Sequence, residues 1–306
     1  MNIIYAGTPF SSSKILKHLI DDPSINIKGV ITKPDKRGKR GKDLLESEVC
    51  KIAKDAGLQI FKPQKLNESE FMKQINLLDV DYMVVVAYGN LIPGWLLEHP
   101  KIMAINIHFS ILPKYRGSSP IQSTLLNGDR RTGVTFMKMS KKLDEGDIIS
   151  TYNLDILADD NKVTLENRLT DLSIEKINEV LIKTNKKDIA FKKQNHDMAS
   201  YCEKIFKENS VTNFDDSSID IINKFKAFFE WPGMSFIYND TVIKIHGIRI
   251  SREKSCNSPG TIDRIDKSGL FINTRDHKIV ITHLQFPNKN KITSLDVFNS
   301  YSSFFK

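Results

Sequence analysis

The chain has 306 residues, of which 40% are hydrophobic and 27% are charged. This length and composition suit two globular domains of ordinary size, and they exclude a low-complexity chain. The net charge of +8 favours an anionic partner, although basicity alone provides only non-specific attraction.

The cysteines and the apolar segments bear on the compartment. Cys50, Cys202 and Cys256 are odd in number and far apart, without metal-ligand spacing, which favours a reducing compartment. No basic segment precedes a long apolar run at the N-terminus, and no apolar stretch reaches the roughly 20 residues that span a bilayer. We therefore expect a cytoplasmic protein with no membrane association, no metal and no obligate protein partner.

The first half of the chain alternates short β-rich runs with helical patterns. The predicted strands are Asn2–Ala6, Ile27–Thr32, Gln59–Phe61, Asp81–Ala87, Met103–His108 and Gly133–Met139. The predicted helices are Ser12–Ile20, Ser47–Ala56, Ser69–Leu77, Gly94–Leu97, Pro120–Leu126 and about Val163–Lys183. The apolar run Met83–Ala87 is typical of a central parallel strand that helices cover on both faces. This order predicts an α/β fold with a doubly wound, mostly parallel, Rossmann-like sheet.

The second half has a different character. The polar stretch Thr184–Asn195 indicates a linker or an exposed hairpin, and one more helix is expected at about Ile219–Phe229. Short strand-like runs follow at Ser235–Tyr238, Val242–Ile250, Gly260–Asp266, Gly269–Asn273 and Lys278–Leu284. Such spacing predicts a small C-terminal β-barrel of OB-like type. The expected division is a first domain at 1–188, a linker at 189–206 and the barrel at 207–306.

Asn106 and His108 form the most informative pair in the sequence. They stand two apart at the end of an apolar run, so a strand would point both side chains to one face. Asp144 follows in the segment Leu143–Asp147. In acyl transfer an Asn can stabilise an oxyanion, a His can manage a proton, and an Asp can fix the His or a water. A strand end with a locally hydrogen-bonded His is the alternative, and the turn Ser110–Pro113 together with Asp144 favours catalysis.

Three predicted strands end near these residues. Val84–Gly89 is a buried strand that runs into a glycine-containing loop, and ligands of open α/β sheets bind beyond the carboxyl ends of strands. Asn106 and His108 also lie at a carboxyl end, and Asp144 follows a further strand. We expect these ends to converge on one crevice, where the exposed backbone of Ala87–Gly89 would suit a flat heterocycle. A purely structural loop is the alternative for this segment.

Two other segments are candidate binding sites. Gly7-Thr8-Pro9 follows the first strand, but G-x-G-x-x-G is absent and Pro9 has no N–H for a phosphate, which favours a structural turn. The loop Thr32–Asp43 carries six Lys or Arg residues against two Asp residues. A solvated surface is the alternative reading of such a run. Its position beside the expected crevice favours a nucleic-acid backbone.

Taken together, these segments resemble the methionyl-tRNA formyltransferases, a branch of the 10-formyltetrahydrofolate-dependent formyltransferases. The matching motifs follow the family's order along essentially the whole chain. They are Ala6–Pro9, Lys33–Asp35, Arg40–Lys42, Val85–Gly89, Asn106-x-His108, Ser110–Pro113, Arg116–Gly117, Pro120–Gln122, Gly133–Thr135, Leu143–Asp147, Trp231–Pro232, Pro259–Ile262 and Leu284–Gln285. Departures such as Ser11 after Phe10, and Arg37-Gly38-Lys39 where the family often has Pro-Ala-Gly, do not touch the three candidate catalytic residues.

The resemblance implies transfer of a formyl group from 10-formyltetrahydrofolate, as cosubstrate, to the amino group of initiator methionyl-tRNA. It implies that Asn106, His108 and Asp144 are catalytic. Tyr88, Gly89, Ser110, Ile111, Leu112 and Pro113 become the expected folate site. Lys36, Arg37, Lys39, Arg40 and Lys42 become the expected tRNA-binding loop, with Arg40 foremost.

Three other functions stay open at this point. A formyltransferase that acts on a nucleotide-linked amino sugar could use the same three residues. A hydrolase that releases formate would turn over folate without an amine acceptor. A non-catalytic RNA-binding module would fit the basic charge but would leave Asn106, His108 and Asp144 unexplained.

Overall fold

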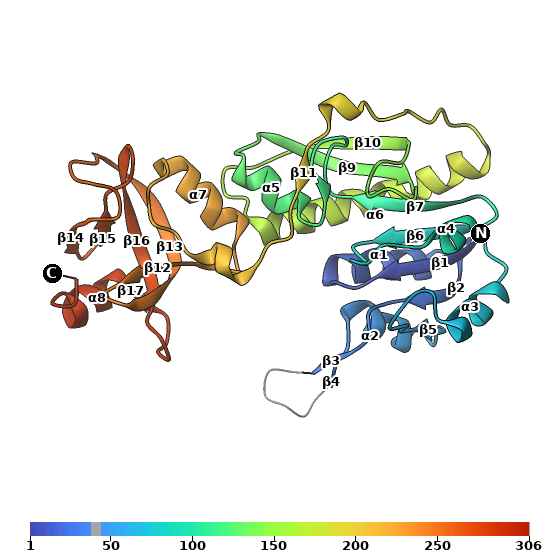
Figure 1. Cartoon of the computed structure of the whole chain (residues 1–306), viewed down its shortest axis with the longest axis horizontal. Coiled ribbons are helices and arrows are strands. Elements are labelled where there is room, and N and C mark those ends of the chain that lie inside the picture. Colours follow the sequence, from blue (N-terminus) through green and yellow to red (C-terminus); the bar gives the residue numbers. More distant parts are fainter. Residues whose placement is uncertain (38–43, 306) are drawn as a thin grey trace. The chain divides into compact units, whose positions relative to one another are not determined.

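The computed structural model of the chain describes residues 1–37 and 44–305 and divides into two compact units (Figure 1). Unit 1 comprises Met1–Pro120, Arg131–Asp155 and Glu166–Glu203, and unit 2 comprises Ile121–Arg130, Ile156–Leu165 and Lys204–Lys306. No helix in the described part of the chain is both long and apolar enough to cross a membrane.

Unit 1 is built on a seven-stranded sheet with the order β10-β9-β7-β6-β1-β2-β5. The strands are β1 (Asn2–Gly7), β2 (Asn26–Ile31), β5 (Ile60–Phe61), β6 (Tyr82–Val86), β7 (Met103–His108), β9 (Arg131–Lys138) and β10 (Ile148–Asp155). The five neighbouring strands β7, β6, β1, β2 and β5 pair in parallel. Strand β9 is antiparallel to β7, and β10 is antiparallel to β9. The predicted mostly parallel, Rossmann-like sheet is therefore confirmed, and β10 is a strand that the sequence analysis missed.

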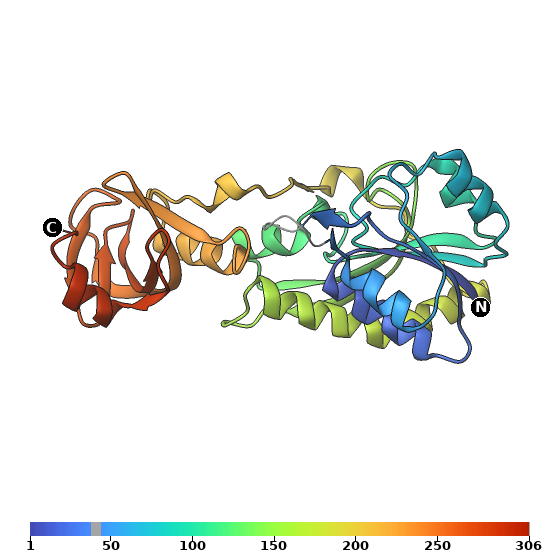
Figure 2. The same ribbon diagram turned by 90° about the horizontal axis from the view of Figure 1, so that it is seen from below.

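Helices cover both faces of this sheet, which explains the continuous apolar run of β6. The helices of unit 1 are α1 (Phe10–Asp21), α2 (Glu48–Asp55), α3 (Ser69–Asn76), α4 (Gly94–Glu98) and most of α6 (Lys162–Asn185). On one face Met83 packs with Phe71 and Ile75 of α3. On the other, the Tyr82 hydroxyl lies 3.0 Å from Oγ1 of Thr184 in α6. In Figure 2, α1, α2 and α6 lie together on this second face.

The chain that follows α6 stays attached to unit 1. The backbone groups of Lys192 and Ile148 exchange two hydrogen bonds of 2.8 and 2.9 Å. Further along, β11 (Tyr201–Cys202) pairs in parallel with β8 (Arg116–Gly117), next to the short helix η1 (His196–Met198). The stretch expected to act as a linker thus supplies residues to the surroundings of β7.

Unit 2 contains a six-stranded antiparallel sheet, in agreement with the predicted change to a β-rich fold. Its strands are β12 (Met234–Tyr238), β13 (Thr241–Lys254), β14 (Ile262–Asp266), β15 (Gly269–Ile272), β16 (His277–Gln285) and β17 (Ile292–Thr293). Its helical segments are α5 (Pro120–Leu126), η2 (Lys207–Ser210), α7 (Ser218–Ala227) and α8 (Ser294–Tyr301). The register shifts at several points where β13 pairs with β16, which bends this long strand around the apolar core.

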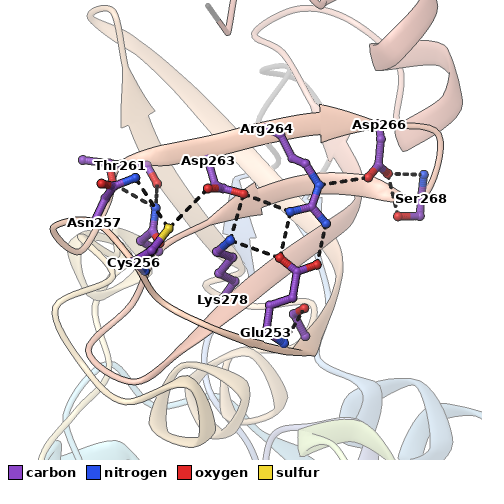
Figure 3. Close-up of polar contacts among 11 residues, drawn as sticks. Glu253, Cys256, Asn257, Thr261, Asp263, Arg264, Asp266, Ser268 and Lys278 are labelled. Atoms are coloured by element: carbon purple, nitrogen blue, oxygen red, sulfur yellow. Dashed lines mark hydrogen bonds and ion pairs between the residues drawn. The ribbon is translucent and has the colours of Figure 1, made fainter.

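A network of ion pairs joins β13, β14 and β16 on unit 2 (Figure 3). The side chain of Lys278 is only 8% exposed, and its Nζ lies 3.0 Å from both Glu253 and Asp263. Arg264 donates two hydrogen bonds of 2.8 and 2.6 Å to Glu253, and its guanidinium lies 3.7 Å from the ring centroid of Phe271. The two carboxylates therefore compensate the charge of the buried lysine.

This network makes the stability of unit 2 depend on pH in the acid range. Hydrogen bonds from Arg264 and then Lys278 lower the pKa of Glu253 to about 2 from 4.5. A carboxyl group with a lowered pKa in the folded state contributes its full stabilisation when the pH is above its pKa in the unfolded chain. That stabilisation disappears as the pH falls from about 4.5 towards 2. We expect an NMR titration of the Glu253 carboxyl to give a midpoint near 2.

The Glu253→Gln variant provides the control. Its melting temperature should lie below that of the unsubstituted chain at neutral pH, and the difference should vanish in acid. An unshifted Glu253 midpoint, or a difference that is constant with pH, would contradict this account of the network.

Candidate active site

Asn106 and His108 occupy the carboxyl end of β7. Asn106 is paired with Val85 of β6 and with Met137 of β9, so it lies in the middle of the sheet. Strand alternation places its side chain on the same face as that of His108, as the sequence predicts. His108 is 6% exposed, whereas Asn106 remains partly accessible. A reactant could therefore reach the amide while the imidazole stays largely shielded from water.

Asp144 reaches this pair by a route that the sequence analysis did not anticipate. We expected a third carboxyl end at the same edge of the sheet. The strand before Asp144, β9, instead runs antiparallel to β7, so its end lies towards the start of β7. The loop between β9 and β10 then carries Asp144 back to Asn106. The crevice thus combines two parallel strand ends with one returning loop.

The three side chains meet at short distances. Asn106 Nδ2 donates to Asp144 Oδ1 over 3.3 Å, and His108 Nδ1 lies 3.8 Å from Asp144 Oδ2. The latter distance is too long for a hydrogen bond. On the other side of the ring, His108 Nε2 is 2.9 Å from the backbone oxygen of Tyr115. Because a carbonyl oxygen only accepts, Nε2 carries a hydrogen and donates it to Tyr115, which leaves Nδ1 on the side of Asp144.

Gly117 holds the Oδ2 atom of this carboxylate. Its N–H donates to Asp144 Oδ2 over 2.8 Å. Gly117 has φ +118°, and a Cβ there would lie 2.3 Å from the carbonyl oxygen of Cys202 in the paired strand β11. Only glycine combines this backbone angle with this packing. The Arg116–Gly117 motif was visible in the sequence, but its contact with Asp144 was not.

The turn Ser110–Pro113 is held by the side chains of Ser110 and of Thr135 in β9. Ser110 is fully buried, and its hydroxyl donates to the backbone oxygen of Lys114 over 2.6 Å. Thr135 Oγ1 donates to the Ser110 oxygen over 2.7 Å and accepts from the Leu112 N–H over 3.2 Å. Leu112 is buried, whereas Ile111 and Pro113 are partly accessible. Of these predicted folate-site residues, Ile111 and Pro113 are therefore the ones whose side chains can reach a ligand.

The loop after β6 exposes its backbone, as expected. Ala87 and Gly89 adopt positive φ values of 48° and 78° and are exposed, while the Tyr88 side chain between them is 2% exposed. Lys33 Nζ donates to the Gly89 oxygen over 3.1 Å. Tyr88 thus belongs to the core, and its neighbours present main-chain groups of the kind that suit the edge of a flat ring.

Only part of the predicted basic loop can be placed. Lys36 and Arg37 form β3, which pairs with β4 (Leu44–Leu45), and the Lys36 side chain is exposed. The predicted tRNA-binding residues Lys39, Arg40 and Lys42 lie outside the described residues. Their proposed role therefore rests on the sequence.

One group of side chains in the described part of the chain has the spacing of metal ligands. Asp35, Glu46 and Cys50 bring one ligand atom each within 4.8 Å of one another. Lys62 Nζ, however, lies 2.7 Å from Asp35 and 3.4 Å from Glu46. Lys54 pairs with Glu46 as well, so two ammonium groups offset the two carboxylates, and the cluster is an ion-pair site at the base of β3 and β4.

The fold and the site together define the class of formyl transferases. The family described as "Formyl transferase" matches residues 1–220, and "Formyl transferase, C-terminal domain" matches residues 204–302. Among solved structures, an N-formyltransferase from Helicobacter canadensis in complex with folinic acid and dTDP-3-aminofucose has a TM-score of 0.67 at 20% identity, covering 91% of this chain and 98% of that one. HypX from Aquifex aeolicus in complex with tetrahydrofolic acid has a TM-score of 0.62 at 17% identity, covering 97% of this chain and 46% of that one. At such identities the similarity concerns the fold alone.

Curated relatives give the narrower assignment. A methionyl-tRNA formyltransferase from Finegoldia magna is 36% identical over 303 residues, which is 98% of this chain and 96% of the relative. A methionyl-tRNA formyltransferase from Francisella tularensis subsp. novicida is 37% identical over 301 residues, again 98% of this chain and 95% of the relative. The chain therefore belongs to the methionyl-tRNA formyltransferase family, as its motifs predicted.

Proposed function

We propose that this chain transfers the formyl group of 10-formyltetrahydrofolate to the free amino group of methionyl initiator tRNA. The observation that carries the proposal is the meeting of Asn106, His108 and Asp144, with the Asn106 amide 3.3 Å from the carboxylate and the His108 ring 3.8 Å from it. Membership of the family along nearly the whole chain agrees with it. The basic loop Thr32–Asp43 and the net charge of +8 suit the anionic acceptor.

The mechanism follows from what these side chains can do. When bound, the folate supplies an activated formyl group on a nitrogen that can leave. The attacking amine has an ordinary pKa of roughly 7.7–8.0, so a useful fraction is neutral near pH 7. Asn106 Nδ2 donates to the oxygen on which negative charge develops, and preorganised donors of this kind stabilise the transition state strongly.

His108 and Asp144 stabilise the charge of the oxyanion and assist the transfer of the amine proton. The Tyr115 carbonyl fixes the ring of His108, so its Nδ1 faces both the reaction space and Asp144. Protonation at Nδ1 would give a second donor to the oxyanion, and the neighbouring carboxylate would stabilise that cation. Asp144 can also hold a water that carries the amine proton to the leaving nitrogen.

The folate site is proposed at the exposed backbone of Ala87 and Gly89 and the accessible side of the Ser110–Pro113 turn. Both segments border the end of β7, because Val85 of β6 pairs with Asn106. We also propose a functional division into a catalytic domain at 1–188 and a tRNA-binding domain at 207–306. The segment 189–206, expected as a linker, joins the two in sequence, and its residues up to Glu203 belong to unit 1. A protein with this function acts in the cytoplasm and uses no metal.

The experiment that tests the function compares acceptors. Purified chain with labelled 10-formyltetrahydrofolate is offered charged initiator tRNA, the same tRNA uncharged, or a nucleotide-linked amino sugar. We expect label on charged tRNA only. Formylation of the amino sugar instead would favour the second candidate function, and release of formate without any acceptor would favour a hydrolase.

The basic loop yields a separate prediction. Arg40→Ala should raise the KM for charged tRNA by roughly tenfold, because a phosphate contact is lost, while folate binding stays unchanged. The KM is measured at several salt concentrations, and the variant should show a weaker salt dependence. An equal loss of tRNA and folate affinity would mean that this residue shapes the active site instead.

A further inference from the structure

Arg116 is a fully buried cation in unit 1, and the chemistry proposed above does not use it. Its side chain is 0% exposed. The one carboxylate near it among the described residues is that of Glu145, 3.5 Å from Nη1, while Nη1 also donates to the Tyr201 hydroxyl over 3.1 Å and Nη2 lies 3.3 Å from His196 Nδ1. Burying a guanidinium is costly unless its donors are satisfied, so an arginine in this place needs an explanation.

The strongest contacts of Arg116 are with an amide. Gln194 Oε1 accepts from Arg116 Nε over 3.0 Å and from Nη2 over 2.8 Å. Arginine offers only donors, so the oxygen of this amide must face Arg116 and its NH₂ group must face the other way. There, Gln194 Nε2 lies 2.8 Å from the backbone oxygen of Asp144 and 2.8 Å from that of Gly146. The guanidinium therefore sets the orientation in which the Gln194 amide donates to the backbone of the Asp144 loop.

These two hydrogen bonds from Gln194 hold a strained segment of backbone. Asp144 has φ +51°, a left-handed conformation that non-glycine residues adopt rarely and that the surroundings must enforce. Gln194 binds the carbonyls on both sides of Glu145. Gly117, the residue after Arg116 on β8, donates its N–H to the Asp144 carboxylate over 2.8 Å. One short strand thus anchors both the backbone and the side chain of Asp144.

We infer that Gln194 and Arg116 are positioning residues for formyl transfer, which hold the Asp144 carboxylate against Asn106 and His108. The inference rests on the proposed catalytic role of Asp144. It makes the segment after α6, which looks like a linker in the sequence, part of the catalytic machinery.

The test exchanges the amide for an acid. Gln194→Glu can still pair with Arg116, but it cannot donate to two carbonyl oxygens and repels them instead. We expect kcat to fall about 10- to 100-fold, as for a misplaced catalytic group, with the KM for folate and for tRNA changed much less. Asn178→Asp is the matched control, because this amide of α6 donates to Asp22 over 2.7 Å and its replacement destabilises the fold without touching the site. This control should lower the melting temperature and leave kcat unchanged.

A double-mutant cycle with Asp144→Asn separates positioning from general destabilisation. If Gln194 acts through Asp144, Gln194→Glu should add less than about twofold to the loss in Asp144→Asn. Independent multiplication of the two losses, or a folded Gln194→Glu variant with normal kcat, would overturn the inference. Normal formylation by Asp144→Asn itself would instead overturn the proposed catalytic role of Asp144.

Gln194→Asn keeps the test decisive if the glutamate variant does not fold. It retains an amide but is one methylene too short to span from Arg116 to both carbonyls. The same fall in kcat and the same non-additivity with Asp144→Asn are expected. Their absence in this folded variant would overturn the inference equally.

Discussion

Replacing either Asn106 or His108 by alanine is expected to reduce the single-turnover rate of formyl transfer about 10²- to 10³-fold, the usual loss for one oxyanion donor. The Asn106 amide lies 3.3 Å from the Asp144 carboxylate and the His108 ring lies 3.8 Å from it, so all three side chains can contact one carbonyl group. Folate affinity should change little, because the donors act on charge that develops only in the transition state. Quenched-flow measurement with labelled donor and charged tRNA, beside a separate binding titration, checks both expectations.

His99→Ala is the matched control for His108→Ala. The Nε2 atom of His99 lies 3.1 Å from the backbone oxygen of Leu78, much as His108 contacts Tyr115, but His99 stands at the end of α4 and is not one of the candidate catalytic residues. The control should keep normal turnover. Unimpaired transfer in both Asn106→Ala and His108→Ala would remove the proposed oxyanion donors from the mechanism.

Gly117→Ala should damage both the fold of unit 1 and the catalytic site. The new Cβ would lie 2.3 Å from the Cys202 oxygen at φ +118°, so β8 must move away from β11. We expect a loss of about 1–3 kcal/mol in the free energy of unfolding from the strained backbone. Turnover should fall about 100-fold as well, because the N–H that holds Asp144 moves with the strand. Urea unfolding and steady-state kinetics measure the two effects.

Gly57→Ala separates strain from function. Gly57 also has positive φ, +65°, but a Cβ there would meet nothing within 4 Å. This variant should lose about 1 kcal/mol of stability and no activity. If Gly117→Ala keeps normal turnover, the contact between its N–H and Asp144 has no role in catalysis.

Local patterns in the sequence were sufficient for much of this architecture. Met83 and its neighbours read as a strand covered on both faces, because a continuous apolar run has few other uses in a short segment. Asn106 and His108 could be placed on one face because strand alternation depends only on spacing. Both inferences use interactions between residues close in the chain.

The features that were missed depend on distant contacts. Gln194 lies in a polar stretch that resembles any solvated segment, and its partners Arg116 and Asp144 are 78 and 50 residues away. Strands β8 and β11 have two residues each, too few for a periodic signal. The reversed direction of β9 is likewise a property of the sheet, so the sequence supplied Asp144 but not its path to the site.

The most direct measurement of the central claim is a crystal structure of the chain with a stable 10-formyl folate analogue. We expect the formyl oxygen at about 3 Å from the Asn106 amide, with His108 and Asp144 around the same carbon, as hydrogen bonding to a developing oxyanion requires. A formyl group that binds away from these three side chains, out of reach of all of them, would contradict the account.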